Sequence, residues 1–471
     1  MTAQAQKKEV RTLDVSSPFD GSLIRTIPMH SADDAEAMLE KALACYRNRD
    51  GWLEHHERIA VLEKLAFFID AEADDFALLI AQEGGKPLTD ARVEVARAID
   101  GIGLAIKELS HVMRGEEIPM GHTPAATGRT ALTTYEPIGV VVAISAFNHP
   151  LNLIVHQVVP AIAVGCPVIV KPAPTTPLNC IRFVELVYEA GLSEEWCQYI
   201  VCDNDVAEKL VTDSRIHFFT FIGSAKVGWM LRSKLAPGVR CALEHGGAAP
   251  VIVDDTADLD TVIPSLLKGA FYHAGQVCVS VQRVFAAESI AADLAQRLAE
   301  GADKLKVGDA TKEDTEVGPL ILPGEVERVH TWVTEAVDDG AQLLTGGKKL
   351  SDTTYAPTVL FNPPMDAKVS TLEIFGPVVC VYAYKDRGEA IDRANGLDTA
   401  FQAAVYTNDL AVARDTIKRL DASTVMVNDH TAFRVDWMPF AGRRTSGHGV
   451  GGIGYTMHDM IQHKMAVFKR E

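Results

Sequence analysis

The 471-residue sequence lacks long apolar runs. No window approaches the roughly 20 consecutive apolar residues that a membrane-spanning helix requires. Residues 1–8 carry two lysines with no apolar stretch after them, which is not typical of a signal peptide. These absences predict a cytoplasmic protein that does not use a membrane.

Paired cysteine motifs are also missing. The eight cysteines include no Cys-x-x-Cys pair and have no histidines at zinc-site spacing, so we expect no bound metal. Seven of them are expected to be small, buried hydrophobic residues in a reducing compartment, namely Cys45, Cys166, Cys180, Cys197, Cys202, Cys241 and Cys380.

Basic residues are too few for a polyanionic partner. The chain has 45 Lys and Arg against 63 Asp and Glu, which gives a net charge of -18. Nucleic acids and anionic membranes attract clustered basic residues, so neither is expected as a partner. An anionic small molecule would need a local basic pocket, because the long-range field repels it. The sequence also contains no internal repeat and no low-complexity segment.

The patterns that are present predict an α/β protein. A hydrophobic fraction of 47% and a charged fraction of 23% are typical of globular proteins, and the length suffices for about three domains. Apolar residues at helical spacing predict helices over 32–110. After that, β-branched runs alternate with helical stretches in two blocks, which predicts two parallel α/β domains. The predicted strands are 138–144, 167–170, 196–201, 216–222, 251–253, 284–286 and 378–381, and the predicted helices are 151–164, 176–190, 259–274 and 291–302.

Two runs indicate carbonyl chemistry. Cys278 lies in Gly-Gln-Val-Cys-Val-Ser, and Glu244 opens the earlier run Glu-His-Gly-Gly. A thiolate can attack a carbonyl carbon, and a carboxylate with a raised pKa can activate the water that hydrolyses the adduct. A helix N-terminus or a cofactor cation is expected to lower the pKa of the thiol. The alternatives are a structural thiol and a Glu244 that pairs with Arg240 or another cation.

A third run, Phe147-Asn148-His149-Pro150, follows directly on the predicted strand 138–144. Ligands of α/β sheets lie at this carboxyl end of the strands. The Asn148 amide is therefore expected to donate to a developing alkoxide, together with the backbone N–H of Cys278. The alternative is an ordinary turn into the helix that begins at Pro150.

These runs together resemble the aldehyde dehydrogenase superfamily, whose further motifs appear in order from about Glu136 onward. The resemblance implies that Cys278, Glu244 and Asn148 oxidise an aldehyde to the acid in a homodimer or homotetramer. It also implies an α/β fold with a Rossmann-like cofactor domain, an α/β catalytic domain and a small β oligomerisation arm. The corresponding residues are 1–114 and 136–246, then 247–454, and finally 115–135 and 455–471.

The resemblance also assigns a cofactor site. It implies that Lys171 reaches the adenosine ribose, that Gly223 and Ser224 approach the diphosphate, that Glu373 binds the nicotinamide ribose and that Phe375 lies beside the ring. Pro174 replaces the glutamate commonly found three positions after this lysine, so NAD is expected and NADP stays an alternative.

Two features are not explained by this pattern. The run 449–454 matches G-x-G-x-x-G, but it follows a loop and leaves too little chain for a βαβ unit, so it is not expected to hold a diphosphate. His245 stands where the family usually has an apolar residue, and the sequence gives no reason for it.

The run Phe433-Arg434-Val435-Asp436 resembles a narrower branch of lactaldehyde, non-phosphorylating glyceraldehyde-3-phosphate, sulfoacetaldehyde and phosphonoacetaldehyde dehydrogenases. In that branch it borders the substrate entrance. Arg434 and His149 are therefore expected to bind a short anionic aldehyde, with Arg97 or Arg283 as further candidates. The alternative is that Arg434 pairs with Asp436 or with an interdomain carboxylate and that the substrate is neutral, as lactaldehyde is.

Two other kinds of protein compete with this interpretation. The first is a dehydrogenase that passes the acyl group to coenzyme A, but such relatives generally lack the glutamate at position 244. The second is a non-enzymatic relative, which would have lost Cys278 or Glu244, and both are present.

Overall fold

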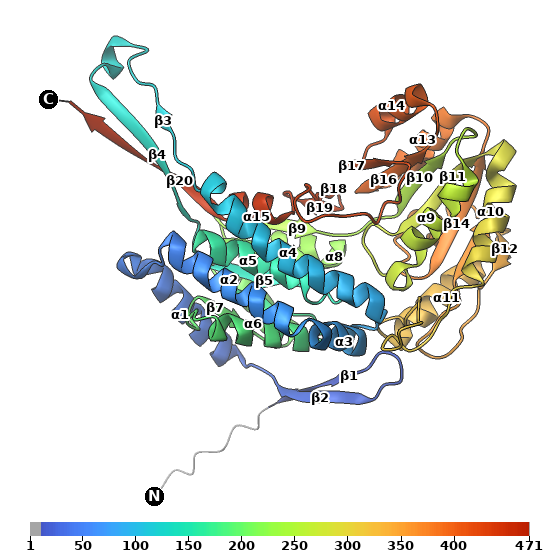
Figure 1. Ribbon diagram of the computed structural model, residues 1–471, viewed down its shortest axis with the longest axis horizontal. Helices are drawn as coiled ribbons and strands as arrows, with labels where there is room; N and C mark the ends of the chain where they lie inside the picture. The colour runs from blue at the N-terminus through green and yellow to red at the C-terminus, as the bar shows by residue number, and fades with distance from the viewer. Residues whose placement is uncertain (1–10, 471) are drawn as a thin grey trace, which may run out of the picture.

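The computed structural model describes residues 11–470. Residues 1–10 and Glu471 lie outside the described part, and with them the segment from which the absence of a signal peptide was predicted. Two α/β units stand side by side, and a narrow β arm that ends at the C-terminus projects from the first unit (Figure 1). No described helix is long and apolar enough to cross a membrane.

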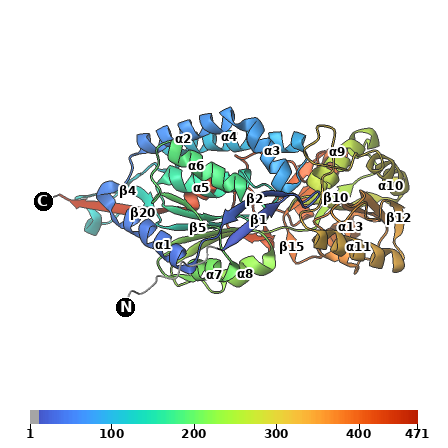
Figure 2. The ribbon, with the colours of Figure 1, turned by 90° about the horizontal axis from the view of Figure 1, so that it is seen from below.

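The first unit is built on a six-stranded sheet whose strands are parallel except for β19 at one edge. Helices cover both of its faces, with α2 to α6 on one and α1, α7 and α8 on the other (Figure 2). The strands in spatial order are β19 (Gly447–His448), β9 (Arg240–Glu244), β8 (Phe218–Ile222), β5 (Val141–Ile144), β6 (Val168–Lys171) and β7 (Cys197–Tyr199). The helices are α1 (Ala32–Arg47), α2 (His55–Ala71), α3 (Ala73–Gly84), α4 (Leu88–Val112), α5 (Asn152–Val164), α6 (Leu178–Glu189), α7 (Asn204–Thr212) and α8 (Ala225–Arg232).

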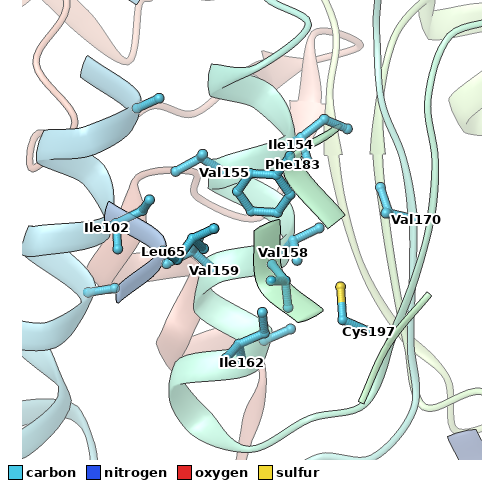
Figure 3. Close-up of a cluster of buried hydrophobic side chains, with 14 of the residues drawn as sticks. Leu65, Ile102, Ile154, Val155, Val158, Val159, Ile162, Val170, Phe183 and Cys197 are labelled. Atoms are coloured by element: carbon cyan, nitrogen blue, oxygen red, sulfur yellow. The ribbon is translucent and has the colours of Figure 1, made fainter. Parts of the chain in front are cut away.

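Helix α5 lies at the centre of this unit and is buried along its whole length. Its sequence is apolar on all sides, which suits a helix packed between a sheet and other helices. Figure 3 shows valine and isoleucine side chains of α5 beside Leu65 of α2, Ile102 of α4, Phe183 of α6 and Val170 of strand β6. Because α5 begins just after Asn148 and His149, this packing fixes the position of the loop that carries them.

The second unit contains a seven-stranded sheet that is parallel except for β12 at its edge. The strands in spatial order are β12 (Gln342–Thr345), β13 (Thr358–Phe361), β14 (Val378–Tyr384), β11 (Val281–Ala287), β10 (Ala249–Val253), β16 (Gln402–Tyr406) and β17 (Thr424–Val427). The helices are α9 (Leu259–Phe271), α10 (Glu288–Ala302), α11 (Pro323–Asp338), α12 (Lys368–Thr371), α13 (Arg387–Asn395) and α14 (Leu410–Arg419).

Smaller elements complete the fold. The arm is a three-stranded antiparallel sheet in which β20 (Ile461–Lys469) pairs along the full length of β4 (Arg129–Pro137), with β3 (Glu117–Ile118) at the edge. Helix α15 (Ile453–Asp459) precedes β20. Two further pairs of strands are β1 (Thr12–Ser16) with β2 (Leu23–Pro28) and β15 (Thr399–Ala400) with β18 (Arg443–Arg444).

The predicted alternation of strands and helices is present, with differences in the bounds. The helix predicted over 259–274 ends at Phe271, so that prediction was wrong in its last three residues. His273 and Ala274 have φ angles of 47° and 54°, in the left-handed region, because the chain turns sharply there toward Cys278. The hairpin β1–β2 and the sheet strands β9, β12, β13, β16 and β17 were not predicted. The assignment of whole domains to cofactor binding, catalysis and assembly stays a prediction.

Candidate active site

A single cavity of about 920 Å³ gathers all the predicted site residues. The first unit contributes residues at or after the carboxyl ends of its strands, and the second contributes loops that precede β11 and β14 or follow β17. The predicted residues that line the cavity are Asn148, His149, Lys171, Gly223, Ser224, Glu244, Cys278, Glu373, Phe375 and Arg434.

Cys278 is half-buried at the cavity wall, in the loop that leads into β11. Burial raises the pKa of its thiol to about 12, the nearby Glu373 adds to this, and Arg434 acts in the opposite direction. Of the two groups expected to lower this pKa, a helix N-terminus does not follow Cys278, because the next element is strand β11. The thiol therefore needs another positive group or base before it can act as a nucleophile.

A strained turn and a buried glutamine hold the cysteine loop. Residues 273–275 all have positive φ, and a Cβ atom on Gly275 would lie 2.1 Å from the Gly376 carbonyl oxygen, so only glycine fits there. The Gln276 side chain donates to the Pro319 carbonyl at 3.2 Å and accepts from the Ile321 N–H at 2.9 Å. These contacts fix the backbone just before Cys278.

Asn148 lies against this loop. Its side chain is only 6% exposed, and its amide donates to the Gln276 carbonyl at 2.9 Å. The following helix is anchored by Glu94, which accepts from the N–H groups of Leu151 and Asn152 at 2.9 and 3.1 Å. Glu94 itself pairs with Lys86, and both side chains are almost fully buried. Sequence reasoning missed this pair, because neither residue belongs to a motif.

Glu244 ends strand β9, and its carboxylate packs against the backbone of Gly451. A Cβ atom on Gly451 would lie 2.1 Å from the Glu244 Oε1 atom, so this glycine of the run 449–454 makes room for the carboxylate. Burial raises the pKa of Glu244, and Arg434 opposes the shift. The alternative that Glu244 pairs with Arg240 was wrong, because Arg240 donates to the Ile461 carbonyl.

His245 is explained by packing. It is 2% exposed, and its Nδ1 lies 2.8 Å from the Gly223 carbonyl oxygen. A Cβ atom on Gly228 would lie 2.1 Å from its ring, so the imidazole fills the space over this helical glycine. The ring thereby joins the end of β9 to the turn between β8 and α8.

Further residues of the cavity wall offer polar groups that fit a dinucleotide. Lys171 ends strand β6, and Pro174 also lines the wall. Ser224 precedes α8, and its side chain makes no capping hydrogen bond, so the helix N-terminus is open to an anion. Glu373 Oε1 is buried without a hydrogen-bond partner in the described part of the chain, and burial raises the pKa of this residue to about 8. A ribose hydroxyl would satisfy such an oxygen.

Glu373 and Phe375 are shaped by close contacts. A Cβ atom on Gly246 would lie 1.6 Å from Glu373 Oε1, so only glycine at that position leaves room for the carboxylate. Phe375 has a φ of 48°, and its ring meets that of Phe147 edge-on at 5.9 Å. These contacts place both side chains at the cavity beside the loop of Asn148.

Arg434 is half-buried at the cavity wall near Cys278 and Glu244. Its guanidinium stacks on Phe440, 3.6 Å from the ring centroid. No carboxylate within residues 11–470 lies at ion-pair distance from it. The alternative that Arg434 pairs with Asp436 was wrong, because Arg97 and His156 occupy that carboxylate, each at 2.7 Å.

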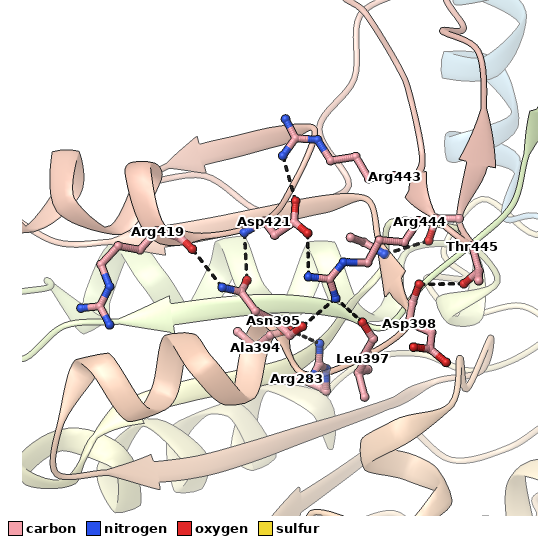
Figure 4. A network of polar contacts seen from close by, with 12 residues as sticks. Arg283, Ala394, Asn395, Leu397, Asp398, Arg419, Asp421, Arg443, Arg444 and Thr445 are labelled. Carbon is pink, nitrogen blue, oxygen red and sulfur yellow. Dashed lines mark hydrogen bonds and ion pairs between the residues drawn. The ribbon is translucent and has the colours of Figure 1, made fainter.

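The other basic candidates differ in their positions. Arg97 lines the cavity, although Asp436 holds its guanidinium. His149 is half-buried, and loss of water around the ring with the nearby Lys86 lowers its pKa, so the imidazole is neutral. Arg283 was a wrong candidate: it is 1% exposed and donates to the backbone carbonyls of Ala248, Arg393 and Ala394, within the polar network of Figure 4.

The eight cysteines are all free thiols. Among the seven that were expected to be buried, Cys45 and Cys241 are only partly so. The remaining five lie in the hydrophobic interior.

Comparison with known proteins gives the family. Residues 5–466 match the model of the aldehyde dehydrogenase family. The 3-sulfolactaldehyde dehydrogenase of Priestia aryabhattai is 36% identical over 457 residues, which cover 97% of this chain and 94% of that protein.

Two solved structures also match over nearly the whole chain. Aldehyde dehydrogenase 21 from Physcomitrella patens, in complex with the reaction product succinate, is 34% identical, with a TM-score of 0.94 and coverage of 98% of this chain and 96% of that one. The glyceraldehyde-3-phosphate dehydrogenase GapN of Methanocaldococcus jannaschii, complexed with NADP, is 33% identical, with a TM-score of 0.92 and coverage of 98% and 100%. These matches confirm the predicted fold class, and the chain belongs to the aldehyde dehydrogenase family of oxidoreductases.

Proposed function

We propose that this protein oxidises a short anionic aldehyde to the corresponding carboxylic acid, with NAD or NADP as oxidant and Cys278 as nucleophile. The observation that carries the choice of substrate is the half-buried Arg434, which faces the cavity without a carboxylate partner in the described chain. A cation that is partly removed from water without a countercharge is unfavourable, and a substrate anion would supply that charge. Arg434 influences the pKa values of both Cys278 and Glu244, so it lies near the reacting centre, as a short substrate requires.

The relatives support an anionic substrate by analogy. The Priestia enzyme acts on a sulfonated aldehyde by its name, and the Physcomitrella enzyme was crystallised with succinate. The alternative substrate is a neutral hydroxyaldehyde such as lactaldehyde, which would leave Arg434 unpaired in the complex.

The chain's own groups suggest how the reaction proceeds. The Cys278 sulfur adds to the aldehyde carbon, and the oxygen of the thiohemiacetal lies near the Asn148 amide and the Cys278 backbone N–H. One N–H of the Asn148 amide is fixed by the Gln276 carbonyl, so the second is available to the oxyanion. The thiohemiacetal becomes the thioester by losing a hydride to the oxidant and a proton. Glu244 then takes a proton from water, and the resulting hydroxide attacks the thioester carbon and releases the acid and the Cys278 thiolate. Transfer of the acyl group to coenzyme A is the less favoured outcome, because Glu244 is present.

Further polar groups of the cavity wall would hold the cofactor. We assign Lys171 to the adenosine ribose, Gly223 and Ser224 to the diphosphate, and Glu373 with Phe375 to the nicotinamide riboside. When bound, NAD or NADP supplies the two-electron acceptor for the oxidation. Pro174 places no negative charge near the ribose, so we propose that NAD is preferred and that NADP is also used.

We also propose a cytoplasmic homodimer or homotetramer with no nucleic-acid or membrane partner. The support for assembly is the apolar surface of the arm, where Leu132, Met465, Val467 and Phe468 are exposed. The eight free thiols agree with a reducing compartment. Light scattering after size exclusion would measure the assembly, and a monomer at micromolar concentration would contradict the proposal.

The test of the substrate class is Arg434→Ala on a panel of aldehydes. Wild type should prefer succinic semialdehyde or sulfoacetaldehyde over propanal. A desolvated charge-assisted contact is worth about 1.5–3 kcal/mol, so the variant should lose roughly one to two decades of kcat/KM for the anionic aldehydes and little for propanal. Arg443→Ala, which removes an exposed charge that pairs with Asp421, is the control. Equal losses of kcat/KM for the anionic aldehydes and for propanal would show that Arg434 has a structural role only.

A further inference from the structure

Arg434 is the end of a chain of polar side chains that continues behind the cavity through the buried His156 and Asp436. Nη2 of Arg434 donates to Nδ1 of His156 at 3.4 Å, and Nε2 of His156 lies 2.7 Å from Asp436 Oδ1. His156 is 3% exposed and projects from α5, the helix that is buried on every side. A side chain on so rigid an element can hold a neighbour in one orientation.

The two neighbours of His156 demand the same tautomer. Burial alone would raise the pKa of Asp436, but His156 and Arg97 hold it well below its usual range, so this carboxylate only accepts. Arg434 only donates, because a guanidinium has no acceptor. The imidazole therefore carries its hydrogen on Nε2 and offers Nδ1 as an acceptor. Burial and the adjacent Arg434 lower the pKa of His156 to about 4, which keeps the ring neutral at working pH.

Arg434 has no other polar restraint within residues 11–470. Stacking on Phe440 fixes the plane of the guanidinium, but it leaves rotation within that plane free. Arg434 Nε is buried without a hydrogen-bond partner in this part of the chain. The contact with His156 is thus the hydrogen bond that sets which edge of the guanidinium faces the cavity.

We propose that His156 is a positioning residue for substrate specificity: Asp436 fixes its tautomer, and its Nδ1 orients Arg434 toward the anion of the substrate. The inference rests on the proposed function, in which Arg434 binds that anion. His156 does not line the cavity and so acts only through Arg434. Arg97 belongs to the same hydrogen-bonded chain, because its two contacts with the Asp436 carboxylate hold that side chain in place.

Two substitutions separate the two sides of the imidazole. In His156→Gln the amide nitrogen can replace Nε2 and still donate to Asp436, but the acceptor for Arg434 is lost. In His156→Asn the amide oxygen can replace Nδ1 and still accept from Arg434, but the contact with Asp436 is lost. A role that is only structural would make the two variants similar or would favour Gln, which keeps the shorter hydrogen bond.

The test measures kcat and KM for succinic semialdehyde, sulfoacetaldehyde and propanal in both variants. His156→Gln should raise KM for the anionic aldehydes about fivefold to tenfold, with kcat and the propanal kinetics within about twofold of wild type. His156→Asn should stay closer to wild type on the anionic aldehydes. In an Arg434→Ala background, His156→Gln should cause no further loss, because the two residues act as one unit.

The outcomes distinguish the inference from the function on which it rests. If Arg434→Ala abolishes the anionic preference but His156→Gln leaves it intact, or if the two losses add, the inference is overturned and the proposed function stands. If Arg434→Ala lowers kcat/KM equally for all three aldehydes, both the inference and the proposed anionic substrate are overturned. Should His156→Gln not fold, NMR of wild-type protein labelled with 15N-histidine gives the tautomer directly. The Nε2–H form is expected for His156, and the Nδ1–H form would overturn the inference.

Discussion

Replacing Glu244 with glutamine separates the two chemical halves of the proposed reaction. Glutamine has nearly the same shape, so it should still pack against Gly451, and no ion pair is lost in the described part of the chain. An amide cannot take a proton from water, whereas the oxyanion contacts of Asn148 and Cys278 are unchanged. The variant should therefore form the thioester and then stall.

The magnitude follows from the role of a general base, which contributes about 10²–10⁴-fold to a rate. Steady-state turnover of Glu244→Gln should fall by that factor, while the first turnover should still produce about one equivalent of reduced cofactor per active site. In wild type, the pKa of Glu244 is raised by burial, and only the ionised form is a base. Deacylation should therefore become faster as pH rises through this raised pKa, and the variant should lose that dependence.

Stopped-flow absorbance of the reduced cofactor measures the burst and the steady state in one trace. Glu63→Gln is the matched control, since Glu63 is exposed on α2 and should behave as wild type. Loss of the burst in Glu244→Gln would show that Glu244 is needed before the thioester forms. Undiminished steady turnover would show that another group is the base.

Two further substitutions test neighbouring parts of the site. Gly451→Ala should displace the Glu244 carboxylate and slow turnover by about tenfold or more, since the new Cβ would lie 2.1 Å from Oε1 of Glu244. The control Gly103→Ala, in open space on α4, should have no effect. Equal rates in the two variants would show that Glu244 lies elsewhere during catalysis. Pro174→Glu should lower kcat/KM for NADP more than for NAD by like-charge repulsion, and equal losses would show that position 174 does not face the ribose.

The candidate site could be read largely from local motifs. Cys278, Glu244 and Asn148 each lie in a short run tied to the end or start of a strand, so the sequence places the side chain and the backbone turn together. All ten predicted site residues line one cavity for this reason. Seven of the parallel strands were also predicted, because strands buried on both faces are nearly continuous β-branched runs, whereas β9, β13, β16 and β17 were missed.

What the sequence could not give are contacts between distant segments. The sequence does not distinguish Arg283 from the other candidate cations, yet its guanidinium donates hydrogen bonds to backbone carbonyls of distant segments. His156 lies within an apolar helix and meets its partners Arg434 and Asp436 only through the fold. The left-handed turn at 273–274 was also missed, because non-glycine residues there give no local signal for ending a helix.

The central claim is that Cys278 carries the acyl group, and mass spectrometry of acid-quenched enzyme tests it most directly. Wild-type protein is mixed with NAD and succinic semialdehyde, quenched during turnover and digested with protease. The mass of the Cys278 peptide should then be increased by the mass of the aldehyde minus two hydrogens. Cys278→Ala should give neither this adduct nor turnover. An unmodified Cys278 peptide during turnover, together with an adduct on another residue or turnover by Cys278→Ala within about tenfold of wild type, would contradict the account.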